Sequence, residues 1–201
     1  MSKLAFIFPG QGAQKAGMGK DFYENSEAAR SFFDQAQKIL DFDLKEMCFG
    51  EHEELNLTEY TQPCMVSVCL AIVQELKKRG INPDITAGLS LGEYAAVAAA
   101  GGMNELDAIK LVRRRGILMQ STVPAGEGAM AAVLGLDAKK IEEILESFEN
   151  VWIANYNCPG QIVITGLTNE VQQASLALKE AGAKRVVELR SEERRVGKEC
   201  R

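Results

Sequence analysis

Residues 83–100 read PDITAGLSLGEYAAVAAA, a short apolar run, a glycine-containing turn and an alanine-rich run. The short run 83–87 predicts a strand, and the alanine-rich run 93–100 predicts a helix. Between them, residues 88–92 match the pattern Gly-x-Ser-x-Gly, whose two glycines allow a sharp turn that lifts the serine hydroxyl out of a sheet. The stretch predicts an α/β fold in which Ser90 is a candidate nucleophile. An ordinary turn serine is the alternative.

A second glycine-rich turn follows the first predicted strand. The apolar run 4–8 ends at Pro9-Gly10-Gln11-Gly12, and the carboxyl ends of strands are where sites of α/β proteins collect. The turn that contains Ser90 is of the kind called a nucleophile elbow. A glycine-rich turn beside this elbow can offer a backbone N–H to an oxyanion. A plain strand-to-helix turn remains the alternative. Phosphate binding is disfavoured because no Gly-Lys-Ser/Thr and no complete Gly-x-Gly-x-x-Gly is present.

The remaining periodicity predicts two domains and a tail, with an α/β domain over 1–125 whose helices lie at 27–40, 64–79, 93–100 and 105–119. Over 126–189 the expected order is β-α-β-β-α-β, the ferredoxin-like pattern. Its strands are expected at 128–136, 151–155, 161–165 and 184–189, and its helices at 138–148 and 169–181. In the tail, 190–201, eight of the twelve residues are charged. We interpret it as non-native, like a translated sequencing adapter, with a solvated native tail as the alternative.

Composition excludes several classes of protein. Of the 201 residues, 46% are apolar and 25% charged, as in an average globular protein. A net charge of -5 disfavours nucleic-acid binding, and the N-terminal apolar run is too short for an export signal or a membrane span. The five cysteines show no Cys-x-x-Cys spacing, which predicts reduced thiols in the cytoplasm. A single histidine argues against a zinc site.

The helix expected over 105–119 carries three consecutive arginines, 113–115. At 100° per residue, Arg115 falls within an apolar arc, whereas Arg113 and Arg114 point away from it. A buried guanidinium needs an anionic partner, and its planar fork suits a carboxylate. A ligand carboxylate and an internal ion pair are the two alternatives. The residues that define the arc are Ala108, Leu111, Val112, Leu118 and Met119.

His52 lies in the polar, acidic segment 50–54, where a surface position is more plausible than a role as a base. Ser90 therefore has no obvious general base in this chain.

Six sequence blocks occur in an order that resembles the malonyl-CoA:acyl carrier protein transacylases of bacterial type II fatty-acid synthesis. They are residues 8–14 (FPGQGAQ), 61–63 (TQP), 88–94 (GLSLGEY), 115–116 (RG), 128–133 (GAMAAV) and 155–161 (NYNCPGQ).

The resemblance implies an enzyme, an acyl-carrier-protein S-malonyltransferase, with an α/β-hydrolase-like domain and a ferredoxin-like subdomain. Ser90 would carry the malonyl group from malonyl-CoA to the phosphopantetheine thiol of acyl carrier protein. The N–H groups of Gln11 and Leu91 would bind the oxyanion, and Arg115 would bind the malonyl carboxylate. The resemblance also implies no cofactor or metal, no nucleic-acid or membrane partner, and a monomer at full length.

The chain departs from the family pattern in two ways. Leu89 stands where the family usually has histidine, which we expect to alter packing rather than chemistry. The segment that returns to the large domain and carries the catalytic histidine is also missing. We therefore expect a truncated chain that is nearly inactive and marginally stable. Three other possibilities remain open. The chain could be an acyltransferase domain of a polyketide or multidomain synthase, a serine hydrolase with the same elbow, or a non-catalytic binding module.

Overall fold

A computed structural model describes residues 3–122 and 127–189, which form two compact units divided after Thr122. The suspected non-native tail, 190–201, lies outside the described residues. Each unit has its own hydrophobic core. The two units are described separately below.

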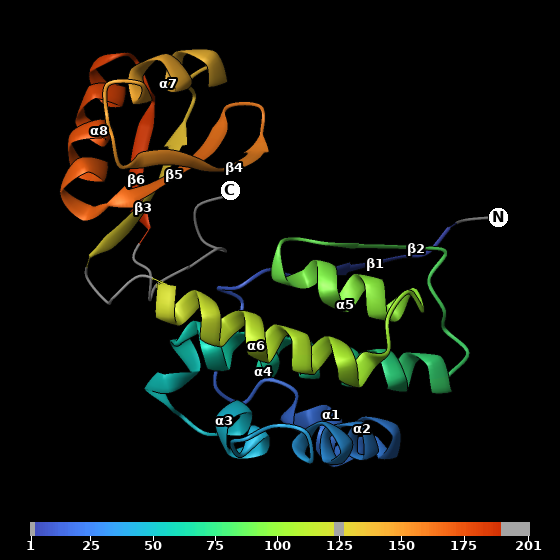
Figure 1. Cartoon of the computed structure of the whole chain (residues 1–201). Coiled ribbons are helices and arrows are strands. Elements are labelled where there is room, and N and C mark those ends of the chain that lie inside the picture. Colours follow the sequence, from blue (N-terminus) through green and yellow to red (C-terminus); the bar gives the residue numbers. More distant parts are fainter. Residues whose placement is uncertain (1–2, 123–126, 190–201) are drawn as a thin grey trace. The chain divides into compact units, whose positions relative to one another are not determined.

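In the first unit, two parallel strands lead into the site. Strand β1 (Ala5–Phe8) pairs in parallel with β2 (Ile85–Gly88), so that the carboxyl ends Phe8 and Gly88 lie opposite each other. Helix α5 (Leu91–Ala99) begins directly after β2 and packs on both strands (Figure 1). The helix begins at Leu91 instead of at residue 93, so the turn is shorter than the sequence suggested.

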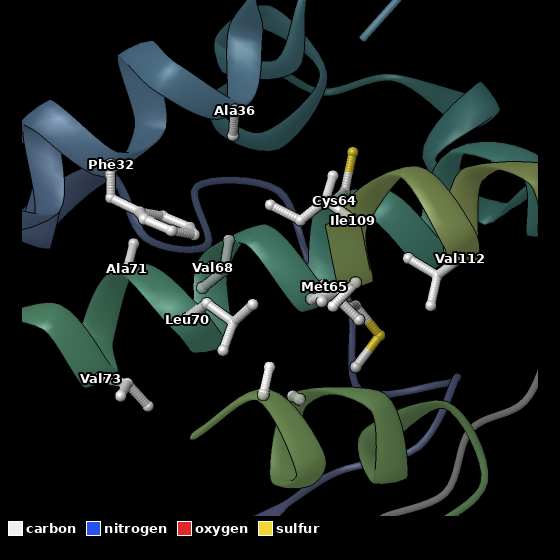
Figure 2. Close-up of a cluster of buried hydrophobic side chains, with 14 of the residues drawn as sticks. Phe32, Ala36, Cys64, Met65, Val68, Leu70, Ala71, Val73, Ile109 and Val112 are labelled. Carbon is white, nitrogen blue, oxygen red and sulfur yellow. The ribbon is translucent and has the colours of Figure 1, made fainter. Parts of the chain in front are cut away.

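Helices form the rest of the first unit, around a core to which α2, α4 and α6 contribute. Figure 2 shows their side chains converging there, among them Phe32 of α2, Leu70 of α4 and Ile109 of α6. The helices besides α5 are α1 (Lys20–Asn25), α2 (Glu27–Gln37), α3 (Leu44–Phe49), the 3₁₀ turn η1 (Glu53–Asn56), α4 (Thr58–Lys78) and α6 (Glu105–Thr122). The sequence analysis missed the two six-residue helices, α1 and α3.

The start of α4 corrects the sequence analysis, because the helix begins at Thr58 rather than at residue 64. Pro63 lies inside the helix and has no N–H, so the carbonyl of Glu59 loses its usual partner four residues later. The Nη1 of Arg113 donates to that carbonyl at 2.8 Å. A neighbouring helix therefore satisfies the group that the proline leaves unpaired.

The second unit is a four-stranded antiparallel sheet with two helices. Its strand order β4-β5-β3-β6 and its β-α-β-β-α-β chain order are those of a ferredoxin-like fold. Alternate residues such as Ala131, Val133 and Ile164 face the core that α7 and α8 help to form. The elements are β3 (Gly128–Leu134), α7 (Ala138–Leu145), β4 (Val151–Cys158), β5 (Gln161–Leu167), α8 (Thr168–Glu180) and β6 (Arg185–Leu189).

Throughout the described parts of both units, no helix combines the length and apolarity needed to cross a membrane.

Candidate active site

Ser90 lies at the turn from β2 to α5 and has a strained backbone. Its φ of 51° and ψ of -101° make it the one non-glycine residue with positive φ in the described part of the chain. Such a conformation costs on the order of 1–3 kcal/mol and persists only where the surroundings impose it. No described residue hydrogen-bonds the Ser90 hydroxyl. The turn therefore presents an unpaired hydroxyl at the start of a helix.

The two glycines that flank Ser90 allow backbone segments to approach closely. A Cβ on Gly88 would lie 2.1 Å from the carbonyl carbon of Gly92. A Cβ on Gly92 would lie 2.3 Å from the carbonyl oxygen of Phe8. Since real Cβ contacts are never this short, neither position accepts a side chain without moving the turn.

The glycine-rich turn after β1 lies beside the Ser90 turn. The N–H of Leu89 donates to the carbonyl of Phe8 at 3.2 Å, and a Cβ on Gly10 would lie 2.9 Å from the carbonyl oxygen of Leu89. No acceptor in the described part of the chain takes the N–H of Gln11 or of Leu91. Two backbone donors therefore remain available on the two adjoining turns, one on each.

Arg115 lies on a different part of α6 from the one the sequence suggested. Leu111, Leu118 and Met119 of the expected apolar arc are 45%, 50% and 48% exposed. Ala108 and Val112 of that arc are buried as expected, and Ile109 and Gly116 complete the buried face of α6. Arg115 is half-buried at the rim of this face, because the helix is rotated relative to the expected arc.

The guanidinium of Arg115 lies close to α5, the helix that follows Ser90. Its Nη1 donates to Oε1 of Gln62 at 2.6 Å, and its central carbon lies 5.6 Å from the ring centroid of Tyr94, one turn after Ser90. In the described part of the chain no carboxylate lies within 4.0 Å of Arg115, which argues against the internal ion pair considered above. The positive charge is therefore available to an anion.

Arg113, which was expected to point away from the apolar arc of the helix, is buried and holds an internal ion pair. Its side chain is only 12% exposed, its Nε and Nη2 each donate to a carboxylate oxygen of Asp41 at 2.8 Å, and Glu59 lies 3.2 Å from Nη1. The hydrogen bond from Arg113 lowers the pKa of Asp41. The guanidinium also lies 5.2 Å from the ring centroid of Phe42 and 5.0 Å from that of Tyr60. Of the three arginines, Arg113 is the one that holds an internal ion pair.

Two cysteine thiols of the first unit are poor nucleophiles, and its histidine is paired with a glutamate. Burial raises the pKa of the Cys69 thiol to about 11, and a hydrogen bond to Cys48 together with burial raises the pKa of Cys64. These thiols are therefore protonated at neutral pH and are poor nucleophiles. His52 lies at the start of η1, where its Nε2 is 3.0 Å from Oε1 of Glu46.

Sequence reasoning missed three residues around Arg115. Gln62 is fully buried and binds Arg115, Tyr94 lies under its guanidinium, and Thr58 hydrogen-bonds Gln62. The blocks 61–63 and 88–94 contained the first two, but spacing along the chain does not show that α4 and α5 both approach α6 here. No sequence signal pointed to Thr58, because it precedes residue 64, where the helix was expected to begin.

Comparisons with known proteins agree with this geometry. Residues 5–195 match the family described as the acyl transferase domain. The malonyl CoA-acyl carrier protein transacylase of Bacillus subtilis (strain 168) is 48% identical over 194 residues, which cover 94% of this chain and 61% of that protein.

Solved structures lead to the same family. The malonyl CoA-acyl carrier protein transacylase of Clostridium perfringens ATCC 13124 is 43% identical with a TM-score of 0.86, covering 94% of this chain and 60% of its own. A malonyl-transacylase in complex with its type II PKS acyl-carrier protein is 40% identical with a TM-score of 0.85, covering 94% and 62%. The chain thus spans about three-fifths of the length of these relatives. Both the expected fold class and the family resemblance are confirmed, and the chain belongs to the acyl transferase domain family.

Proposed function

We propose that the protein is an acyltransferase that moves a malonyl group from malonyl-CoA to the thiol of an acyl carrier protein through an ester on Ser90. One observation supports malonyl as the acyl group. Arg115 has no carboxylate partner in the described structure and lies against Tyr94, one turn after Ser90. A planar guanidinium in this position suits the free carboxylate of a malonyl group. The names of the relatives support the same substrate and carrier.

The proposed reaction has two halves. In the first, the Ser90 oxygen attacks the thioester carbonyl and gives its proton to a general base. The C–S bond then breaks as the malonyl ester forms, and the CoA sulfur leaves with that proton. In the second, the carrier thiol gives its proton to the base and attacks the ester carbonyl, and the Ser90 oxygen leaves and takes up that proton. The N–H groups of Gln11 and Leu91 stabilise the oxyanion in both halves. In this proposal the transferase itself uses no metal or cofactor, and the reaction takes place in the cytoplasm.

The general base is proposed to come from the part of the relatives that this chain does not match. In the described part of the chain, His52 is paired with Glu46, and no described residue hydrogen-bonds the hydroxyl of Ser90. A serine without a base retains only oxyanion and binding contributions, so we expect little activity from the 201 residues alone. Assays of turnover therefore use residues 1–189 joined to the remaining C-terminal segment of the Bacillus subtilis relative, here called the joined chain.

The role of Arg115 is tested by acyl selectivity. In the joined chain, Arg115→Ala should lower kcat/KM for malonyl transfer by roughly 10- to 100-fold and leave acetyl transfer unchanged, because acetyl has no carboxylate for the guanidinium to bind. Arg114→Ala is the matched control, since its exposed side chain lies on the same turn. Equal losses for the two acyl groups would remove the carboxylate role. Release of free malonate regardless of carrier protein would indicate a hydrolase instead.

A further inference from the structure

A chain of side-chain hydrogen bonds links Arg115 to the turn that contains Gln11. Arg115 Nη1 lies 2.6 Å from Gln62 Oε1, and Gln62 Nε2 lies 2.8 Å from Thr58 Oγ1. Thr58 Oγ1 in turn lies 2.8 Å from Oε1 of Gln11. The four residues come from α6, α4 and the turn after β1, so the chain joins three segments that are distant in sequence.

The direction of these hydrogen bonds is fixed by chemistry. A guanidinium has donors only, so the oxygen of the Gln62 amide must face Arg115 and its NH₂ must face Thr58. The Thr58 hydroxyl, which accepts from Gln62, has its one proton left to donate to the oxygen of Gln11. The NH₂ end of Gln11 is therefore the end that remains, and no described residue accepts from it.

Burial and packing hold the middle of this series of hydrogen bonds in place. Gln62 is fully buried, and its NH₂ also lies 3.4 Å from the sulfur of Met119. The N–H of Thr58 donates to Oε1 of Gln120 at 3.2 Å, which ties the first turn of α4 to α6. Breaking one link leaves buried polar groups unpaired, so the arrangement has few alternatives.

We propose that Thr58 is a positioning residue that couples the carboxylate site at Arg115 to the donors of Gln11. This inference rests on the proposed function, in which those two residues bind opposite ends of the malonyl group. An anion on Arg115 changes the hydrogen bond that Arg115 gives to Gln62, and the change passes through Thr58 to Gln11. A ligand with a carboxylate is thereby recognised at the turn that supplies the oxyanion donor.

The test compares Thr58→Val, which keeps the shape and loses the hydroxyl, with Thr58→Ser, which keeps the hydroxyl. Nitrogen-labelled 201-residue chain is titrated with malonate, and NMR follows Arg115 Nε–H and the side-chain NH₂ groups of Gln11 and Gln62. In the wild type and Thr58→Ser, malonate should shift both the Arg115 and the Gln11 signals. In Thr58→Val the Arg115 shift should remain and the Gln11 shift should vanish.

Hydrogen exchange of the Gln62 NH₂ gives a second measurement that needs no ligand. Thr58→Val should accelerate it about fivefold, the factor for a net hydrogen bond of about 1 kcal/mol, and Thr58→Ser should not. A Gln11 signal that responds in Thr58→Val as in the wild type would overturn the proposal, as would a Thr58→Ser variant that behaves like Thr58→Val. If malonate moves no Arg115 signal, the carboxylate role in the proposed function fails, while the exchange comparison still decides whether Thr58 orders the chain.

Discussion

The strained backbone of Ser90 is the residue-scale feature that separates this serine from an ordinary turn serine. With φ at 51°, the Cβ of Ser90 is unfavourable, and the close contacts of Gly88 and Gly92 prevent the turn from relaxing. A turn that only reversed the chain would place glycine at this position as well. Retaining a serine here costs stability and leaves a hydroxyl unpaired, which is the pattern expected of a functional group.

Ser90→Gly should therefore raise the free energy of unfolding by about 1 kcal/mol, because it removes the strain at the cost of some chain entropy. Urea unfolding of the 201-residue chain measures the difference. Ser90→Ala is the control and should change stability little, since it keeps the Cβ that causes the strain. A glycine variant no more stable than the alanine variant would show that the turn is unstrained.

Prediction at the residue scale succeeded where a local pattern carries the information. The pattern Gly-x-Ser-x-Gly, between an apolar run and an alanine-rich run, correctly placed Ser90 at a strand-to-helix turn. The three consecutive arginines were harder, because the helix period offered an internal ion pair as an alternative for Arg115, whereas Arg113 is the residue that holds it. Arg113 became the buried arginine because Asp41, Phe42 and Glu59 surround it, and none of these neighbours is near it in sequence.

At the scale of elements, the close approach of α4 and α6 determines where Arg115 lies. A Cβ on Gly116 would lie 2.8 Å from both Cα of Glu59 and the carbonyl oxygen of Thr58. The missing side chain lets α6 lie directly on the first turn of α4. The pair Arg115-Gly116 thus combines the charged group with the glycine that brings its helix within reach of Gln62.

Gly116→Ala should destabilise the chain by about 1–3 kcal/mol, although alanine favours helix by about 1 kcal/mol over glycine. The added Cβ meets backbone atoms that cannot rotate away, so the helices must separate. The measurement is the midpoint of urea unfolding, with Arg114→Ala as an exposed control on the same helix that should stay within about 0.5 kcal/mol of the wild type. An alanine variant as stable as the wild type would contradict the close packing.

The same pair of helices shows why element boundaries were harder to predict than element types. The helix was expected to begin at residue 64, yet it begins at Thr58. Its first turns depend on Arg113 and Gln120 of α6, which satisfy the Glu59 carbonyl and the Thr58 N–H. Because those partners lie more than fifty residues away, local propensity does not reveal them.

At the scale of the whole molecule, the sheet of the first unit is sparsely covered. Ile7 and Ile85 are 79% and 54% exposed on the two-stranded sheet, whereas parallel sheets are normally covered on both faces. Apolar side chains of β1 and α4, including Phe6 and Ile72, line a cavity of about 430 Å³ that neither Ser90 nor Arg115 lines. We therefore still expect this chain to be marginally stable, because apolar side chains on its two-stranded sheet are left uncovered.

In the proposed function, Ser90 receives a malonyl group at a site built by the two turns and Arg115. The most direct measurement is peptide mapping by mass spectrometry after the joined chain has been incubated with malonyl-CoA. The account predicts one malonyl ester on the peptide that contains Ser90, none in Ser90→Ala, and far less in the 201-residue chain alone. A malonyl group on another residue, or an equally malonylated Ser90→Ala variant, would contradict it.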